Sequence, residues 1–249
     1  MPKNKTIGVV LVFYNTPQKQ MKSVVQQFNT IADTNMLLCI DNSKHNIGYA
    51  RAVNKGIRSL QKNKPDIVII ANPDIEILKI TRTTIFETAQ HFDIFGFPFR
   101  ENEHTYYVGK IDRLNMSGGF SQSKETNMYT PSDFISGSFM CVNNNIFNGI
   151  GYFNTSYFMY YEDVEFCIRA KRNRIRIGIR TDVQYTHMST INPDKEYYLT
   201  RNRLLLLSRY GTLKQKLHEI VASVKHCLLP IHKVKIRAVK DFIKMYFFN

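Results

Sequence analysis

Two adjacent carboxylates, Glu162 and Asp163, stand directly after the aromatic stretch YFMYY at residues 157–161. One acid is enough to cap a helix, and its charge near the helix N-terminus is worth about 0.3–1 kcal/mol. Two acids beside large aromatic side chains also indicate a carboxyl group partly removed from water, whose pKa rises toward that of a useful general base. The pair therefore has two interpretations, helix capping and proton transfer.

Three more residues could bind a ligand or a metal ion. Asp74 follows an apolar segment and Pro73, and its carboxylate suits Mg²⁺ or Mn²⁺ held against a diphosphate, although Asn-Pro-Asp also forms turns. Asp41 ends another apolar segment, where it could bind a nucleobase or ribose or close an Asx-turn. His187 is of interest only as a second ligand of the metal that Asp74 would hold.

These residues need a scaffold that brings distant parts of the chain together. Continuous apolar runs over 7–13, 36–40 and 66–71 predict buried strands, and helical apolar patterns separate them. This alternation predicts an α/β fold with a mixed, mostly parallel sheet flanked by helices. Such sheets bind ligands outside the carboxyl ends of their strands, where Asn15 and Asp41 stand in this chain.

The remaining chain divides into a polar middle and a basic end. Residues 101–132 predict a hairpin and a mobile loop, and 162–173 predict a helix. We expect an α/β domain over 1–195 and an appendage of amphipathic helices over 196–249. The last 49 residues hold 11 lysines and arginines against two acids, so +9 of the formal charge of +14 lies there.

Cysteine spacing and hydropathy favour the cytoplasm. The four cysteines are widely separated, which suits reduced thiols better than a disulfide or zinc framework. No apolar run reaches the roughly 18 residues of a membrane-spanning helix, and the apolar segment near the N-terminus is interpreted as a strand rather than a signal peptide.

Six motifs follow one another in the chain: VVLVFYN, DNSKHNIGYARAVNKGI, ANPDIEI, FISGSFMCV, IGYFNTSYFMYYEDVEFCIRA and TH. Each is weak by itself, but in this order and spacing they resemble the family 2 glycosyltransferases, especially a bacterial rhamnosyltransferase-like branch. The resemblance runs over about residues 7–187, three quarters of the chain. It implies the Rossmann-like GT-A fold, followed here by a C-terminal helical appendage.

The resemblance also implies roles for single residues. Asp163 would be the catalytic base, Glu162 and Tyr161 would contact the acceptor, and Asp74 and His187 would hold Mg²⁺ or Mn²⁺. The positions implied for binding the nucleotide-sugar donor are Phe13, Asn15, Asp41, Asn46, Asn72 and Arg201.

The implied reaction is an inverting transfer of a sugar from a dTDP- or UDP-sugar to a glycan or a polyprenyl-diphosphate-linked glycan. L-Rhamnose from dTDP-rhamnose, in O-antigen or capsule synthesis, is the first expectation. The chain has GYFN at 151–154 and Glu165 where the family usually has GGFD and Asp, so galactofuranosyl or other hexosyl transfer stays open. A non-catalytic sugar-nucleotide-binding protein of the same fold also stays open, as does a nucleic-acid-binding protein, which the high positive charge invites.

The basic tail suggests a charged partner. It interleaves apolar and basic residues as an interfacial helix does, which favours an anionic membrane surface and a peripheral place on the inner face of the cytoplasmic membrane. A packed helix pair with a solvated basic face is the alternative. No nucleic-acid partner is expected, because the charge is concentrated in the tail and no nucleic-acid-binding module is recognisable.

Overall fold

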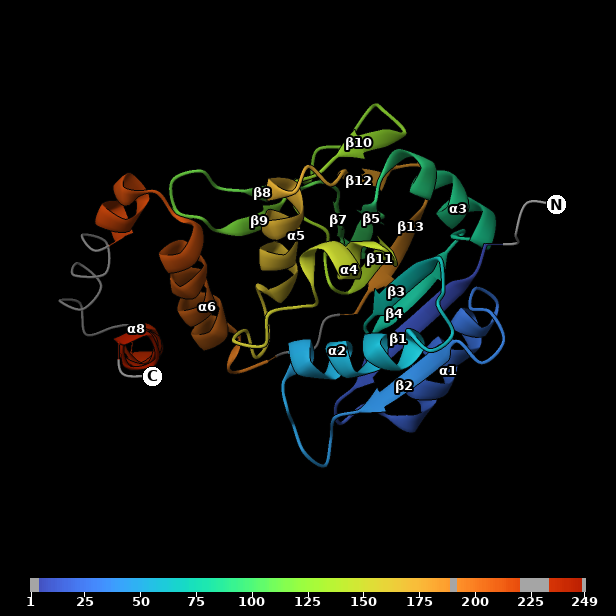
Figure 1. Cartoon of the computed structure of the whole chain (residues 1–249), viewed down its shortest axis with the longest axis horizontal. Helices are drawn as coiled ribbons and strands as arrows, with labels where there is room; N and C mark the ends of the chain where they lie inside the picture. Colours follow the sequence, from blue (N-terminus) through green and yellow to red (C-terminus); the bar gives the residue numbers. More distant parts are fainter. Residues whose placement is uncertain (1–4, 189–191, 220–232, 248–249) are drawn as a thin grey trace. The chain divides into compact units, whose positions relative to one another are not determined.

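The computed structural model describes residues 5–188, 192–219 and 233–247 (Figure 1). The chain forms two compact units. Unit 1 comprises Met1–Lys110, Phe120–Phe158 and Glu162–Thr190. Unit 2 comprises Ile111–Gly119, Met159–Tyr161 and Ile191–Asn249.

Unit 1 is built on a mixed sheet that has seven strands among the described residues. In spatial order these are β10 (Tyr129–Pro131), β12 (Ile177–Arg180), β5 (Ile94–Gly96), β11 (Phe139–Asn143), β3 (Ile67–Ala71), β1 (Ile7–Phe13) and β2 (Leu37–Asp41). β1 runs parallel to β2 and β3, and β5 runs parallel to β12. β11 is antiparallel to β3 and β5, and β10 is antiparallel to β12. The predicted α/β class and the three predicted N-terminal strands are confirmed.

Helices cover both faces of the N-terminal strands (Figure 1). α1 (Gln18–Asn29) contributes Val24 and Phe28 to the core that also contains Val9. α2 (Tyr49–Leu60) lies on the other face, where Gly56 approaches Val10 so closely that an added Cβ would stand 2.4 Å from it. Because both faces are covered, every residue of β1 and β3 is buried, which explains their continuous apolar sequences.

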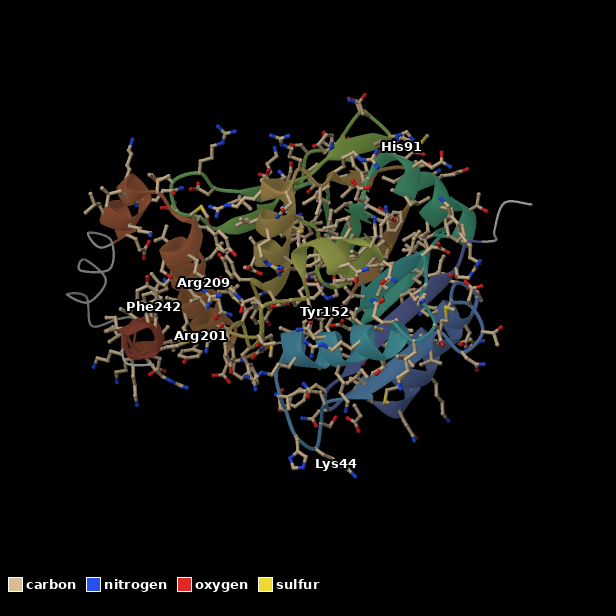
Figure 2. All side chains as sticks on the ribbon, viewed as in Figure 1. Lys44, His91, Tyr152, Arg201, Arg209 and Phe242 are labelled. Atoms are coloured by element: carbon tan, nitrogen blue, oxygen red, sulfur yellow. The ribbon has the colours of Figure 1, made fainter. Side chains whose placement is uncertain are left out.

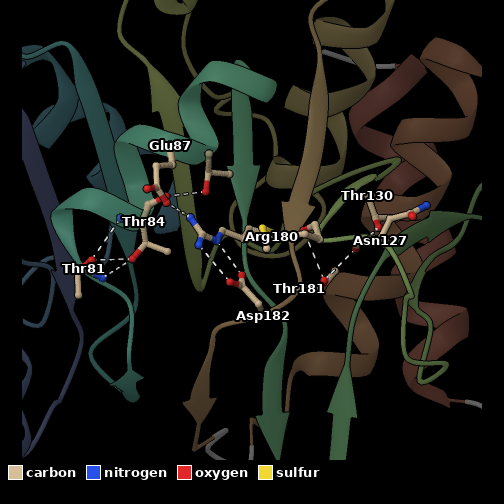
Figure 3. Close-up of polar contacts among 10 residues, drawn as sticks. Thr81, Thr84, Glu87, Asn127, Thr130, Arg180, Thr181 and Asp182 are labelled. Atoms are coloured by element: carbon tan, nitrogen blue, oxygen red, sulfur yellow. Dashed lines mark hydrogen bonds and ion pairs between the residues drawn. The ribbon is translucent and has the colours of Figure 1, made fainter.

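Residues 75–96 hold elements that the sequence patterns did not predict. They are β4 (Ile75–Leu78), α3 (Arg82–His91) and β5. α3 begins with a capping box in which Thr81 and Thr84 bond each other's backbone N–H groups, a Thr-Thr version of the usual Ser/Thr-Glu pattern. Figure 3 shows this cap beside Arg180 of β12, whose guanidinium pairs with Glu87 of α3 at 2.5 Å and with Asp182 at 2.7 Å.

A second sheet joins β4 to the polar middle of the chain. Its described strands are, in order, β4, β13 (Gln184–His187), β6 (Phe99–Glu101) and β7 (His104–Tyr106). The predicted hairpin is present as β6 and β7, and β8 (Gly109–Ile111) pairs with β9 (Gly118–Phe120).

The predicted helix over 162–173 is α5 (Glu162–Arg172), and a short α4 (Ile146–Ile150) precedes it. Glu165, two residues after Asp163, is buried and accepts a hydrogen bond from Arg169 at 2.8 Å. Arg169 also donates to the carbonyl oxygens of Ile150 and Tyr152. Arg169, oriented by Glu165, therefore ties α5 to the preceding turn.

Unit 2 contains α6 (Lys195–Tyr210), helical residues 213–219 and α8 (Lys233–Phe247). Two hydrogen-bonded pairs join them: Tyr197 donates to Asp241 at 2.8 Å, and Arg203 donates to Glu219 at 2.6 Å. Part of the predicted tail, 220–232, lies outside the described residues. No helix in the described ranges is long and apolar enough to cross a bilayer.

Candidate active site

The carboxyl ends of β1, β2 and β3 meet at one edge of the large sheet. Phe13, the last residue of β1, is in register with Asp41, the last residue of β2. The backbone N–H of Asn15 then donates to Ser43 Oγ at 2.9 Å. The polar residues that follow the first two strands are therefore neighbours, as the sheet topology requires.

Phe13 and Asn15 differ in what they offer a ligand. The ring of Phe13 is buried in the core, whereas Asn15 and its neighbour Tyr14 are exposed. Asn15 has φ 48°, in the left-handed region that Asn tolerates better than most residues. Phe13 thus supports the edge from within, and Tyr14 and Asn15 form its surface.

The turn after β2 confirms the Asx-turn interpretation of Asp41. Its Oδ1 accepts the backbone N–H of Ser43 at 2.9 Å, and hydrogen bonds from the hydroxyl and backbone of Ser43 lower the pKa of Asp41. Asp41 is exposed, so its ionised carboxylate also faces solvent at the sheet edge. Asn46 Oδ1 accepts from Asn42 Nδ2 at 3.1 Å and so braces the loop whose tip carries Lys44 (Figure 2).

Asp74 and His187 are brought together by the second sheet. Asp74 directly precedes β4, and β4 pairs with β13 so that Ile75 is opposite His187. Asp74 Oδ1 lies 3.5 Å from His187 Nε2. Both atoms are buried, and neither has a hydrogen-bond partner within the described part of the chain. Asn72 lies just upstream, where its N–H donates to the carbonyl oxygen of Ser138 at 3.0 Å.

A divalent cation fits this pair. Buried polar atoms without partners are costly, and a shared metal ion would satisfy a carboxylate oxygen and an imidazole nitrogen together. Glu101 Oε1 lies 4.0 Å from His187 Nδ1, on the side of the ring away from Asp74, where a carboxylate can orient a metal-binding imidazole. Among the described residues, no cluster of three or more His, Cys, Asp or Glu side chains is placed to hold a metal. A Mg²⁺ ion held by one or two protein side chains usually completes its coordination with water or phosphate oxygens.

Asp163 is fixed by backbone donors. Its Oδ2 accepts the N–H of Gly137 at 2.9 Å, and its Oδ1 accepts the N–H of Val164 at 2.8 Å. Glu162 is buried, and its Oε2 has no hydrogen-bond partner among the described residues. The two acids at the start of α5 therefore have different surroundings.

The two carboxyl groups titrate as an interacting pair. Burial raises the pKa of Glu162 well above its usual range, and the charge of Asp163 raises it further. Burial also raises the pKa of Asp163, but the N–H groups of Gly137 and Val164 oppose that rise. Asp163 is thus the group that ionises first, and Glu162 is the one that keeps its proton.

Tyr49 connects the start of α2 to this pair. Its hydroxyl donates to the carbonyl oxygen of Gly137 at 2.8 Å, and the N–H of the same residue donates to Asp163. The pKa of Tyr49 lies well above its usual range because of burial and then because of the charges of Glu162, Asp163 and Asp74. One hydroxyl therefore experiences the field of both the acid pair and the candidate metal ligand.

The structure places two predicted site residues, Tyr161 and Arg201, in unit 2. Tyr160 and Tyr161 have φ values of 65° and 71°, a left-handed conformation that costs about 1–3 kcal/mol for each such residue. Asn202, fully buried in α6, holds them by donating to the carbonyl oxygens of Met159 and Tyr160, both at 2.7 Å.

Arg201 contacts residues of its own helix, α6. Its guanidinium donates to Asn202 Oδ1 at 2.7 Å and lies over the ring of Tyr198. Figure 2 shows Arg201 and Arg209 on α6. The other residues predicted to bind the donor lie in unit 1.

Four contributors were not predicted from the sequence: Glu101, Tyr49, Gly137 and Asn202. Glu101 lies in the segment interpreted as irregular, and Tyr49 looks like an ordinary helix residue. Gly137 acts through its backbone, so its residue type carries little signal. Tyr49 and Gly137 lie within two of the motifs that carry the resemblance, and Asn202 follows Arg201, but none of the three had been given a role.

No protein-family model matches the sequence. The chain is 34% identical over 182 residues to the low-salt glycan biosynthesis hexosyltransferase Agl10 of Haloferax volcanii, covering 64% of this chain and 57% of that protein. It is 25% identical over 281 aligned residues to the dTDP-rhamnosyl transferase RfbF of Shigella flexneri, covering 96% and 94%. The crystal structure of GalNAc-T7 with UDP, GalNAc and Mn²⁺ superposes with a TM-score of 0.65 at 12% identity, covering 97% of this chain and 55% of that one.

Proposed function

We propose that this chain, which has the GT-A fold of the family 2 glycosyltransferases, transfers a sugar from a nucleotide donor to an acceptor hydroxyl. The fold that the sequence motifs implied is confirmed by the α/β architecture and by the structural likeness to GalNAc-T7. The chain spans 57% of the length of the Haloferax relative.

The pairing of Asp74 with His187 carries the proposal. Two buried ligand atoms, 3.5 Å apart and without hydrogen-bond partners in the described ranges, stand beside the sheet edge where α/β proteins bind ligands. Nucleotide-sugar chemistry needs a group there that can face a diphosphate. Asp74 and His187 would hold Mg²⁺ or Mn²⁺, which would offset the charge that develops on the leaving nucleoside diphosphate.

Asp163 supplies the proton acceptor. The N–H groups of Gly137 and Val164 stabilise its carboxylate and fix its direction. In a single displacement, Asp163 takes the proton of the acceptor hydroxyl as that oxygen attacks the anomeric carbon, which inverts the configuration. Glu162, which keeps its proton, can donate a hydrogen bond to another acceptor oxygen, and Tyr161 lies next to it in sequence.

The other residues proposed to bind the nucleotide-sugar donor form the surface of the proposed nucleotide site. Asn15 and Asp41 lie at the exposed edge and would bind the ribose and base, with Asn72 beside the diphosphate. Asn46 would shape the loop after β2, and Phe13 would support the sheet edge from the core. Arg201 is proposed to contact the donor as well.

The relatives bear on the sugar and the acceptor. The name of the Shigella relative supports L-rhamnose from a dTDP donor, over nearly the whole chain. The Haloferax relative is named only a hexosyltransferase, so galactofuranosyl or other hexosyl transfer is the alternative. The name of the Haloferax relative refers to glycan biosynthesis, which supports a glycan as acceptor. A polyprenyl-diphosphate-linked glycan, met at the inner face of the cytoplasmic membrane, is proposed with it.

The test combines a donor screen with one substitution. We expect turnover of one nucleotide sugar, dTDP-rhamnose first, to require Mn²⁺ or Mg²⁺. Asp163→Asn should lower kcat by about 10²–10⁴-fold while leaving nucleotide affinity nearly unchanged, because an Asn oxygen can still accept from Gly137 but cannot take a proton. Calorimetric nucleotide binding and product detection measure the two effects.

Asp182→Asn is the matched control, since it removes a carboxylate of unit 1 that pairs with Arg180. Its turnover should equal that of the unchanged protein. An undiminished transfer rate in Asp163→Asn would disprove the assignment of the base. Nucleotide-sugar binding without turnover of any donor would favour the non-catalytic alternative.

A further inference from the structure

α8 presents a row of four exposed basic side chains. The row consists of Lys233, Arg237, Lys240 and Lys244. Their spacing of four, three and four residues puts them on one face, because a helical turn takes about 3.6 residues. Within the described ranges, Arg237 pairs with Asp241 at 3.8 Å and lies over the ring of Tyr197, but no ion pair is found for the three lysines.

Apolar side chains flank this row. Val234 and Ile243 of α8, one on each side of the row, are 41% and 43% exposed. The helical residues 213–219 of the same unit add Leu213 and Leu217, which are 74% and 54% exposed and stand four residues apart on one face. The inner face of α8 is different: Ala238 there is fully buried.

This combination is unfavourable in water alone. Like charges three or four residues apart repel each other and destabilise a helix, and α8 carries five cations against one acid. α2 has exposed cations at a similar spacing, Arg51, Lys55 and Arg58, but no large apolar residue of that helix is exposed. Cations next to exposed apolar residues are the pattern of helices that lie in a membrane interface.

We propose that the outer face of α8, together with Leu213 and Leu217, docks on an anionic lipid bilayer. The three lysines and Arg237 meet headgroup phosphates, and Val234, Ile243 and Leu213 enter the boundary between headgroups and acyl chains. This inference rests on the proposed function, because docking would bring the enzyme to a lipid-linked acceptor.

The test is co-sedimentation of the full chain with vesicles. We expect binding to vesicles of phosphatidylcholine with about one-third phosphatidylglycerol and little binding to phosphatidylcholine alone. The triple variant Lys233→Gln/Lys240→Gln/Lys244→Gln should lower the partition coefficient on anionic vesicles by about a hundredfold, because each lysine near an anionic surface contributes about fivefold. Arg237 is left unchanged because it packs on Tyr197.

The matched control removes three exposed lysines of unit 1, as Lys22→Gln/Lys55→Gln/Lys62→Gln. This control should bind anionic vesicles as the unchanged protein does. Equal losses in the two triple variants, or equal binding of the unchanged protein to neutral and anionic vesicles, would overturn the proposal. So would lysine-dependent binding to duplex DNA in a protein that binds no vesicles, which would instead make α8 a nucleic-acid surface.

A second variant tests the apolar contribution while keeping every charge. Val234→Ser/Ile243→Ser should lower vesicle binding by about tenfold or more with little change in the thermal unfolding midpoint, since both side chains are exposed. Undiminished binding would contradict insertion at the interface. Turnover of a soluble acceptor is measured in parallel and should be unchanged in every variant, so a failure of docking and a failure of the proposed activity give different results.

Discussion

Asp163 and Glu162 are neighbours in sequence, yet their surroundings give them different protonation. The carboxylate of Asp163 accepts two backbone N–H groups, from Gly137 and Val164, whereas Glu162 Oε2 is buried without a hydrogen-bond partner among the described residues. A buried carboxyl group beside another carboxylate holds its proton. The capping and proton-transfer interpretations of the pair are thus compatible, because α5 begins at these acids and the first turn also satisfies Asp163.

Glu162→Gln should stabilise the protein at neutral and alkaline pH. The raised pKa of Glu162 means that the folded chain binds more protons than the unfolded chain, so this group lowers the stability as pH rises above its unfolded pKa of about 4.3. Glutamine cannot ionise and avoids that loss. Thermal unfolding should show a Tm about 2–4 °C higher at pH 8, with the gain shrinking toward pH 4.

Glu165→Gln is a suitable control for that measurement. Glu165 is also a buried acid of α5, but it is paired with Arg169, so its substitution should destabilise the protein rather than stabilise it. A Tm gain for Glu162→Gln that is the same at pH 4 and pH 8 would contradict the assigned protonation.

Three elements meet at the backbone of Gly137, which lies just before β11. Tyr49 at the start of α2 donates to the carbonyl oxygen of Gly137, and the N–H of Gly137 donates to Asp163 at the start of α5. The two hydrogen bonds restrain the backbone of Gly137 from both sides of its Cα. The start of α2 is itself fixed, because the N–H of Tyr49 donates to the carbonyl oxygen of Phe158 at 2.6 Å. Tyr49 therefore positions the base without touching it.

Tyr49→Phe should lower kcat by about tenfold with little change in KM for the donor. Loss of the hydroxyl leaves the Gly137 carbonyl without this partner and removes a restraint on the Gly137 backbone, so the N–H of Gly137 is held less firmly toward Asp163. Since that bond stabilises the carboxylate, the pKa of Asp163 should rise and the acid limb of the kcat–pH profile should move to higher pH.

Tyr152→Phe, which also removes one hydroxyl from unit 1, should leave both kcat and the pH profile unchanged; Figure 2 labels Tyr152. The other ionisable groups whose charges act on Tyr49 are Glu162, Asp74 and Tyr185, and all stay in place in both variants. A drop in kcat with an unmoved acid limb would indicate a packing role for Tyr49 rather than a positioning role.

At the scale of the whole molecule, the candidate active site and the basic surface of α8 belong to different units. Unit 1 holds the sheet edge, the Asp74–His187 pair and Asp163, while unit 2 holds the basic row of α8. A ligand of unit 1 should therefore stabilise the fold whether or not a membrane is present, because binding to the folded state alone shifts the unfolding equilibrium.

Mn²⁺ together with the donor nucleotide should raise the Tm. At about one hundred times the dissociation constant the gain is about 2.7 kcal/mol, which corresponds to a rise of roughly 5–10 °C for a chain of this size. EDTA or His187→Ala should remove most of that rise, whereas His104→Ala, on the same sheet, should keep it. An equal rise in EDTA would rule out the Asp74–His187 metal site.

The sequence by itself determined the elements whose signals are local. The apolar runs of β1 and β3, the helical patterns of α1 and α2, and the polar residues after the strands all depend on neighbours in the chain. Asn15 and Asp41 could be assigned to one edge because parallel strands leave no other arrangement. The acids at the start of α5 could also be recognised from the sequence, because they directly follow an aromatic stretch.

Only the tertiary structure decided which distant groups meet. Tyr49 and Gly137 are 88 residues apart and Gly137 and Asp163 are 26 apart, so no local pattern encodes their contacts. The approach of Asp74 to His187 depends on the register of β4 against β13, and β4 was not predicted. Glu101 reaches His187 through a third strand of that sheet. Residue types fix what each group can do, but register and packing fix the distances between them, and those distances make a site.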